Sequence, residues 1–160
     1  MDNMINEALE KLSAPATDKI IGRGSMLDYL NYVLNNDSIA VLGIKGSGGI
    51  GKTALIHAWL KELKLKEYEI DYVYAWHFHD KEKGKESISS STPFFDYLFK
   101  RPLFLEQGSS TNEFFSEERK AKLLFDKLSE KRMILVLDAF EVLQKHDGKV
   151  NGRFADRGYG

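Results

Sequence analysis

Apolar positions recur at helical spacing in several separate stretches of the chain. Met4, Ile5, Ala8 and Leu9 show the pattern near the N-terminus, where every third or fourth position is apolar. The same spacing predicts amphipathic helices over residues 2–12, 26–34, 52–64 and 116–129. A further helix is expected to begin with Thr92 as its N-cap and Pro93 at its first helical position.

Other apolar stretches run without polar interruption and predict strands. They cover residues 39–44, 71–79 and 132–138. A strand covered on both faces of a parallel sheet is apolar throughout, and aromatic or β-branched residues favour extended backbone. Strands that alternate with helices indicate an α/β fold with a parallel sheet and right-handed crossovers. We expect residues 1–19 to form an N-terminal helix and linker, and residues 20–160 to form the main domain.

Composition narrows the class of protein. The 160 residues are 42% apolar and 29% charged with a net charge of −1, which is typical of a soluble globular domain with no bulk attraction to nucleic acid or anionic lipid. The chain has no cysteine, which excludes disulfides and thiolate metal sites. Neither a signal peptide nor an apolar run of the roughly 18 residues that a membrane span requires is present. We therefore expect a cytoplasmic protein without nucleic-acid or membrane partners.

The sequence GSGGIGKT, residues 46–53, matches the phosphate-binding loop pattern G-x-x-x-x-G-K-[ST] in full. A predicted strand precedes it and a predicted helix follows it, as the pattern requires. Glycines allow main-chain N–H groups to surround an anion, and the start of the helix adds a positive dipole end. We expect Lys52 to reach the β- and γ-phosphates of ATP or ADP, and Thr53 to ligate Mg²⁺. The expected nucleotide-binding residues are Gly46, Ser47, Gly48, Gly49, Ile50, Gly51, Lys52, Thr53 and Ala54.

A second candidate lies where the last predicted strand ends. Asp138 follows five apolar residues, so it is expected at the carboxyl edge of the sheet, where ligands bind in such folds. We expect Asp138 to hold Mg²⁺, and Glu141 to polarise the attacking water or to join the metal shell. The alternative for Glu141 is a surface residue on a helix that opens at Phe140. Lys52, Asp138 and Glu141 are thus the candidate catalytic residues, and Thr53 and Asp138 the candidate metal ligands. Ala139 replaces the second acid that often follows such an aspartate, which predicts slow hydrolysis.

Taken together, GGIGKTALI and ILVLDAFEVLQ resemble the STAND class of signal-transduction NTPases, which is related to the NACHT and NB-ARC switch domains. The spacing of Asp138 and Glu141 resembles the D-G-h-[DE] motif of that class. IIGRGSMLDYLNYVL is similar to its h-G-R-E-x-E-L segment, and VYAWHFHD with SSSTPFFDYLF is similar to a W-S-F-Y…S-x-x-x-F segment of certain large bacterial members. Gly24 stands where the class usually has Glu, and Ala139 where it often has Gly.

The resemblance implies a three-layer P-loop NTPase fold that is incomplete, with three core strands and no sensor strand before the chain ends. It implies that Ile21, Gly22 and Arg23 lie near the adenine and ribose; a surface ion pair is the alternative for Arg23. It also implies slow ATP hydrolysis, C-terminal domains of the same protein as partners, and a part in bacterial signalling or anti-phage defence. Without the sensor strand, the strand over residues 39–44 becomes an apolar edge. We expect another copy of the chain, the N-terminal helix or the C-terminal tail to cover it.

Several alternatives remain open. A phosphotransferase needs an acceptor pocket and a closing lid, and a scaffold would bind nucleotide without turnover. A GTPase needs an N-K-x-D motif, which the sequence lacks. His77 and His79 share a strand face but lack a third ligand, so ordinary strand histidines are the better interpretation. The aromatic residues of FFDYLF are expected to pack in the core rather than to stack on bases.

Overall fold

The computed structural model describes residues 3–12, 21–78, 91–105, 115–145 and 153–154. The chain divides into two compact units. The first contains Met1–Ala75 and Met133–Leu135, and the second contains Trp76–Arg132 and Val136–Gly160. The predicted linker over residues 13–19 lies outside the described residues.

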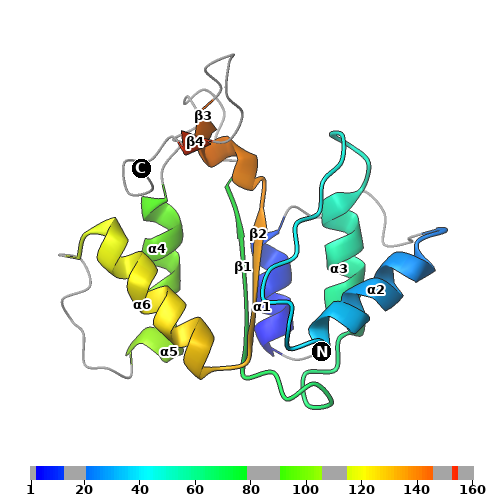
Figure 1. Ribbon diagram of the computed structural model, residues 1–160, viewed down its shortest axis with the longest axis horizontal. Coiled ribbons are helices and arrows are strands. Elements are labelled where there is room, and N and C mark those ends of the chain that lie inside the picture. Colours follow the sequence, from blue (N-terminus) through cyan, green and yellow to red (C-terminus); the bar gives the residue numbers. More distant parts are fainter. Residues whose placement is uncertain (1–2, 13–20, 79–90, 106–114, 146–152, 155–160) are drawn as a thin grey trace. The chain divides into compact units, whose positions relative to one another are not determined.

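Helices α1 (Asn3–Lys11), α2 (Gly24–Leu34) and α3 (Lys52–Glu62) form the helical part of the first unit, close to the predicted bounds (Figure 1). Both α1 and α2 pack against α3. The indole Nε1 of Trp59 donates to Oδ1 of Asn31 over 2.8 Å and so ties α3 to α2. The helices are held mainly by apolar burial, and the buried apolar residues of this unit are Ile5, Ala8, Leu12, Leu30, Leu55, Trp59, Leu60, Leu63, Leu65, Ile70, Val73, Tyr74 and Ala75.

Strands β1 (Tyr72–His77) and β2 (Met133–Asp138) form a two-stranded sheet and run in the same direction, as predicted for a parallel α/β fold (Figure 1). Val73, Tyr74 and Ala75 are buried, whereas all residues of β2 are only half-buried. Each strand begins among residues of the first unit and ends among residues of the second. Strand β2 therefore ends at Asp138, the acidic residue that the sequence analysis predicts at the carboxyl edge of the sheet.

The predicted strand over residues 39–44 is not a strand in this structure, so the expectation of three core strands is wrong for the described residues. Val41 is 87% exposed, and Leu42 and Ile44 are each 37% exposed. Apolar patterning favours extended backbone, but a strand exists only where a neighbour shares its hydrogen bonds. The N-terminal helix packs on α3 and leaves Val41 exposed. Pairing of this run with another copy of the chain stays a prediction, which the mass of the protein in solution tests.

An aromatic core forms the centre of the second unit, where α4 (Thr92–Leu98) packs against α6 (Glu117–Glu130). Ring centroids of neighbouring aromatic pairs lie 4.6 to 6.3 Å apart, the range of favourable ring contacts. The buried apolar residues of this unit are Phe78, Phe94, Phe95, Leu98, Phe99, Leu103, Phe104 and Leu143. The prediction that the FFDYLF aromatics pack in the core is confirmed. Ser91, rather than Thr92, is the N-cap of α4, and a short helix α5 (Pro102–Leu105) follows it.

Helix α6 begins at a true side-chain cap, because Oγ of Ser116 accepts a hydrogen bond from the Arg119 main-chain N–H. Its apolar face is less buried than its spacing predicts, since Phe125 is 69% exposed and Leu128 is 39% exposed. Lys120 is instead the buried residue of α6, and its ammonium lies 3.5 Å from Oδ1 of Asp96 on α4.

After β2 the chain forms a 3₁₀ turn, η2 (Phe140–Leu143), and a short antiparallel pair of β3 (Gln144–Lys145) with β4 (Arg153–Phe154). Gln144 pairs with Phe154, and Lys145 pairs with Arg153. The sequence analysis offers a helix that opens at Phe140, where η2 begins, and predicts neither β3 nor β4.

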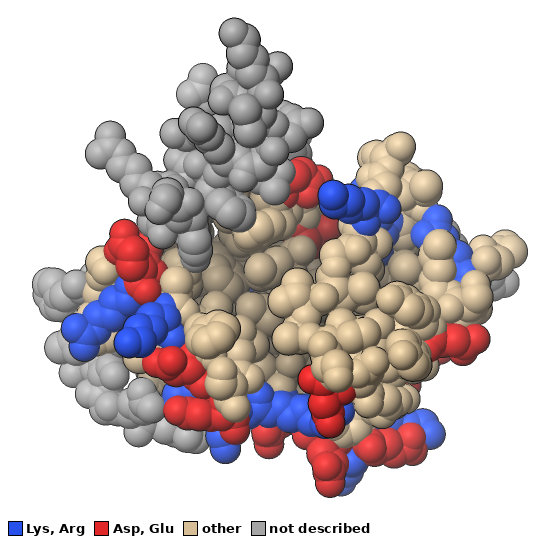
Figure 2. All heavy atoms as spheres, viewed as in Figure 1, with Lys and Arg blue, Asp and Glu red and all other residues tan. Residues whose placement is uncertain are grey.

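Acidic and basic side chains lie close together on the face seen in Figure 2. This mixture agrees with the net charge of −1. No helix in the described part of the chain has the length and hydropathy needed to cross a lipid bilayer. The glycine loop and the ends of β1 and β2 are the places where the structure puts the residues that the sequence analysis singles out.

Candidate functional site

The glycine loop adopts backbone angles that L-residues rarely accept. Gly49 has φ of 76° and Gly51 has φ of 90°, both in the left-handed region. Nothing lies within 4 Å of the place where a Cβ would stand at Gly49, so its glycine is explained by backbone conformation and not by crowding. Residues 46–50 are exposed. The loop thus offers main-chain groups to solvent at the point where α3 begins.

Two cations hold the loop in its curved form. The Lys52 ammonium donates to the carbonyl oxygens of Gly46 over 2.7 Å and Ser47 over 3.2 Å. From the other side, the Arg23 guanidinium donates to the carbonyl oxygen of Ile50. Because an ammonium carries three protons, Lys52 can hold the loop and still point a donor at a ligand. The positive charge of Lys52 therefore lies beside the loop's main chain, as binding of a phosphate requires.

Helix α3 begins at Gly51 without a side-chain cap and without an acidic residue in its first turn. The first N–H groups of any helix lack partners within the helix, and they carry the positive end of the helix dipole. Thr53 and Ala54 lie in this first turn. The sequence thus leaves this helix start open to an anion rather than closing it with its own carboxylate.

Residues Ile21, Gly22 and Arg23 precede α2. Ile21 is 89% exposed and Gly22 has φ of 73°. The contact from Arg23 to Ile50 brings this segment to the glycine loop across 27 positions of sequence. The alternative expectation for Arg23 is a surface ion pair. The contact that the structure shows is instead a hydrogen bond to a main-chain carbonyl oxygen, that of Ile50. Its proximity to a base and ribose stays a prediction.

Asp138 is the last residue of β2, as the sequence predicts. Its carboxylate is held at both oxygens: Oδ1 accepts from the Ala139 N–H over 3.0 Å, and Oδ2 lies 3.0 Å from Nδ1 of His77. Both His77 and Asp138 side chains are 17% exposed. Asp138 belongs to the second unit and the glycine loop to the first. Their action on one ligand therefore stays a prediction.

Glu141 lies on η2 and its side chain is exposed. The turn between Asp138 and Glu141 contains Ala139 with φ of 54°, a left-handed conformation in a residue that has a Cβ. The predicted role of Glu141 as a water-polarising residue is neither excluded nor tested by this placement. The turn itself is unusual, since glycine is the residue that accepts such a φ without strain.

Sequence reasoning missed the contact that His77 makes. The sequence analysis considers a metal pair of His77 with His79 and prefers ordinary strand histidines; His79 lies outside the described residues. The structure instead places it against Asp138. One feature of the sequence could have predicted this contact. His77 and Asp138 are polar residues that follow apolar stretches of two predicted strands, and the carboxyl ends of neighbouring parallel strands meet at one edge of the sheet.

The residues present fit a nucleotide with Mg²⁺ in their donor chemistry. Mg²⁺ prefers hard oxygen ligands and is usually bound through one or two protein groups together with phosphates. Thr53 supplies a hydroxyl and Asp138 a carboxylate. No cluster of three or more His, Cys, Asp or Glu residues exists within the described ranges. Each of the two residues thus carries an oxygen donor of the kind that Mg²⁺ takes together with phosphate oxygens.

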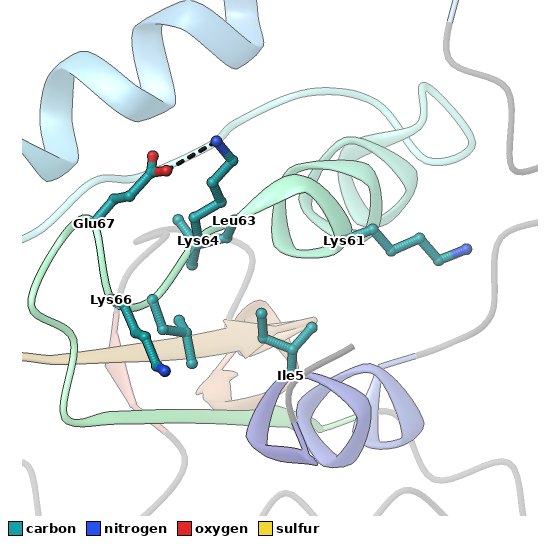
Figure 3. A pocket seen from close by; sticks show the side chains of 7 residues that line it. Ile5, Lys61, Leu63, Lys64, Lys66 and Glu67 are labelled. Carbon is teal, nitrogen blue, oxygen red and sulfur yellow. Dashed lines mark hydrogen bonds and ion pairs between the residues drawn. The ribbon is translucent and has the colours of Figure 1, made fainter.

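A separate hollow of about 360 Å³ lies in the first unit, between α1 and the segment after α3 (Figure 3). Lysines and apolar residues line it, and Lys64 is paired with Glu67 over 2.9 Å at its rim. The Lys64 and Glu67 side chains are 69% and 62% exposed, so the pair is a surface contact of little energetic weight. None of the predicted site residues lines this hollow.

Comparison with known proteins agrees with the interpretation of residues 46–53 as a phosphate-binding loop. Residues 23–159 match the NB-ARC domain family. A probable disease resistance protein of Arabidopsis thaliana is 27% identical over 132 residues, which cover 82% of this chain and 14% of that protein. The chain thus spans about one seventh of the length of this relative. No solved structure matches the chain. The chain belongs to the NB-ARC family of STAND-class P-loop NTPases, and it is a nucleotide-binding module.

Proposed function

We propose that the chain is the ATP- and Mg²⁺-binding switch module of a STAND-type signalling protein, with slow hydrolysis of the β–γ phosphoanhydride bond in the full-length protein. The observation that carries this proposal is the shape of the Gly46–Thr53 loop. Left-handed glycines at 49 and 51, the Lys52 ammonium at the loop carbonyls and a helix start without a cap are all present together. This combination is suited to a phosphate group, because main-chain donors, a helix dipole and a cation converge.

The residues of the loop have separate roles in this proposal. Lys52 offsets negative charge on the β- and γ-phosphates, and the main-chain N–H groups of the loop orient them. The Thr53 hydroxyl and the Asp138 carboxylate would hold Mg²⁺, Asp138 through water. The metal would supply neutralisation of phosphate charge. Ile21, Gly22 and Arg23 contact the adenine and ribose.

Glu141 polarises the water that attacks the γ-phosphate. Its exposed position on η2 leaves it accessible to water. Because Ala139 occupies the place where a second acid often follows the aspartate, only one acid is available near Asp138 in the sequence. Slow turnover follows, which suits a switch in which the bound nucleotide, rather than the rate of its hydrolysis, defines the state.

We take the biological setting of the module from the Arabidopsis thaliana relative. Its name assigns it to disease resistance, and this chain matches only 14% of its length. We accordingly place the module in a cytoplasmic signalling or defence protein, with further domains of the same protein as its partners. Nucleotide state changes how the module packs against those domains. This role needs no nucleic-acid contact and no membrane.

Calorimetric titration of ATP in the presence of Mg²⁺ and in the presence of EDTA tests the proposal. The Mg²⁺ coupling ratio, defined as Kd in EDTA divided by Kd in Mg²⁺, is expected to exceed one for the wild-type chain. Asp138→Asn should bring the ratio close to one, while Kd in EDTA stays unchanged. Asp126→Asn, on the exposed face of α6, makes the same chemical change elsewhere and should leave the ratio at the wild-type value. Equal loss of affinity in both solutions for Asp138→Asn contradicts the metal role.

Release of inorganic phosphate separates the switch from a scaffold without turnover. Slow release that Glu141→Gln abolishes supports hydrolysis with Glu141 as the water-polarising residue. Tight binding of ATP to the full-length protein without any release of phosphate overturns hydrolysis and leaves the binding function standing.

A further inference from the structure

We infer that His77 is a positioning residue for Asp138: its imidazole holds the carboxylate in the orientation in which Asp138 takes part in Mg²⁺ binding. The inference rests on the proposed function. It gives a role to a residue of the VYAWHFHD segment that the sequence analysis interprets as an ordinary strand histidine. His77, Asp138 and Ala139 all lie in the second unit, so the argument requires no knowledge of where the first unit lies.

The strand ends bring the two side chains together. His77 ends β1 and Asp138 ends β2. One residue further, the Phe78 main-chain N–H donates to the carbonyl oxygen of Asp138 over 3.0 Å. This bond fixes the register of the strands next to the site, so that the main-chain positions of His77 and Asp138 lie beside one another.

The Asp138 carboxylate meets a donor at each oxygen. Oδ1 accepts from the Ala139 N–H over 3.0 Å, and Oδ2 lies 3.0 Å from Nδ1 of His77. An ionised carboxylate can only accept hydrogen bonds, so Nδ1 of His77 is the donor in the tautomer that supports this arrangement. Each carboxylate oxygen has two lone pairs, and each of these contacts uses one. The two contacts, one at each oxygen, therefore restrain the plane of the carboxylate.

Aromatic packing makes this arrangement rigid. Phe78 is 8% exposed, and its ring lies 5.6 Å from Phe140 and 5.8 Å from Phe94, measured between ring centroids. Phe140 belongs to the turn after Asp138, whereas Phe78 follows His77. The residues next to both partners are thus packed on each other, so neither strand end can turn away without loss of buried apolar contact. A carboxylate fixed in advance loses less entropy when it binds a metal.

The test compares His77→Leu with His77→Asn in the calorimetric titration of ATP. Leucine has about the volume of histidine and no donor, whereas the amide nitrogen of asparagine takes nearly the place of Nδ1. Loss of a hydrogen-bonding partner of a metal ligand typically lowers metal affinity by ~10-fold or more. We expect His77→Leu to lower the Mg²⁺ coupling ratio toward the value of Asp138→Asn, by up to ~10-fold, with Kd in EDTA unchanged, and His77→Asn to retain most of the wild-type ratio.

A matched control is the neighbouring strand residue. Trp76 packs on Tyr97 with ring centroids 5.1 Å apart and serves the core of the same unit. Trp76→Phe should lower the stability of the protein and leave the coupling ratio unchanged, which distinguishes positioning from general loosening of β1. Circular dichroism of each variant checks that it is folded.

The outcomes separate this inference from the proposed function. A wild-type ratio above one that Asp138→Asn abolishes and His77→Leu leaves unchanged, or raises, overturns the role of His77 alone. A fall of the ratio in both His77 variants also overturns it, since the donor is retained in asparagine. A wild-type ratio of one overturns the metal role of Asp138 and, with it, this inference.

Discussion

Replacement of Ala139 by glycine should stabilise the protein, although it removes a methyl group. Ala139 has φ of 54°, in the left-handed region. In that region the Cβ of an L-residue lies too close to the following carbonyl, whereas glycine has no Cβ. The Ala139 N–H also donates to Oδ1 of Asp138 over 3.0 Å, so the strained residue is part of the candidate site.

The magnitude follows from two opposing terms. Left-handed backbone costs an L-residue about 1–2 kcal/mol, which the glycine variant recovers. Glycine also gains freedom in the unfolded chain, which costs the variant about 0.4–1 kcal/mol. The expected net gain in the free energy of unfolding is therefore about 0–1.6 kcal/mol, with a central value of about 0.8 kcal/mol.

Urea denaturation followed by circular dichroism measures this gain as a shift in the transition midpoint at unchanged slope. Two controls are available in the chain. Glu69 has φ of 52°, so Glu69→Gly should change stability in the same direction at a place remote in sequence. Ala121→Gly removes the same atoms from the interior of α6, where glycine costs about 1 kcal/mol relative to alanine.

An Ala139→Gly protein that is less stable than wild type, by an amount like that of Ala121→Gly, refutes the reasoning. The turn after Asp138 would then not have the left-handed conformation. An unchanged slope in all three variants is required for the comparison, because a changed slope indicates a change in the denatured state.

Three further results are expected. Arg23→Ala should speed amide hydrogen exchange in residues 46–51, because the guanidinium contact with the Ile50 carbonyl is lost; unchanged exchange there contradicts a holding role. Trp59→Phe should lower the free energy of unfolding by about 1–2 kcal/mol, because the acceptor on α2 loses its 2.8 Å donor; urea denaturation measures this loss. The pKa of Glu118 lies below its ordinary value of 4.5, chiefly through a hydrogen bond to its own main chain and also through one to Ser116. The ionised Glu118 carboxylate therefore stabilises the folded protein above pH 4.5, and this effect is lost as the pH falls through the lowered pKa. Glu118→Gln should accordingly make the free energy of unfolding fall less steeply in acid. A fall as steep as that of the wild-type protein contradicts this role of Glu118.

Local patterns predicted the helices well because spacing and capping are properties of a single segment. The predicted helix over residues 116–129 is α6, with Ser116 as its cap. The run over residues 39–44 shows where this reasoning ends. Its apolar residues favour extended backbone, but strand formation depends on a partner elsewhere in the chain, and a pattern within one segment contains no information about that partner.

The candidate site divides in the same way. The glycine loop could be read from sequence because its residues are contiguous, and its left-handed positions fall at Gly49 and Gly51. The contact between His77 and Asp138 joins residues 61 positions apart and depends on strand register. Arg23 meets the Ile50 carbonyl for a similar reason, because the packing of α2 on α3 decides which main-chain group it reaches.

The affinity of Lys52→Ala for ATP tests the central claim most directly. Loss of a charge-assisted contact with phosphate should cost about 1.5–3 kcal/mol, which corresponds to a Kd roughly 10- to 150-fold higher. Lys45→Ala removes the same charge from an exposed position directly before the loop, and it should leave Kd near the wild-type value. A Kd for Lys52→Ala equal to that of the wild-type chain and of Lys45→Ala contradicts the assignment of residues 46–53 as the phosphate-binding loop.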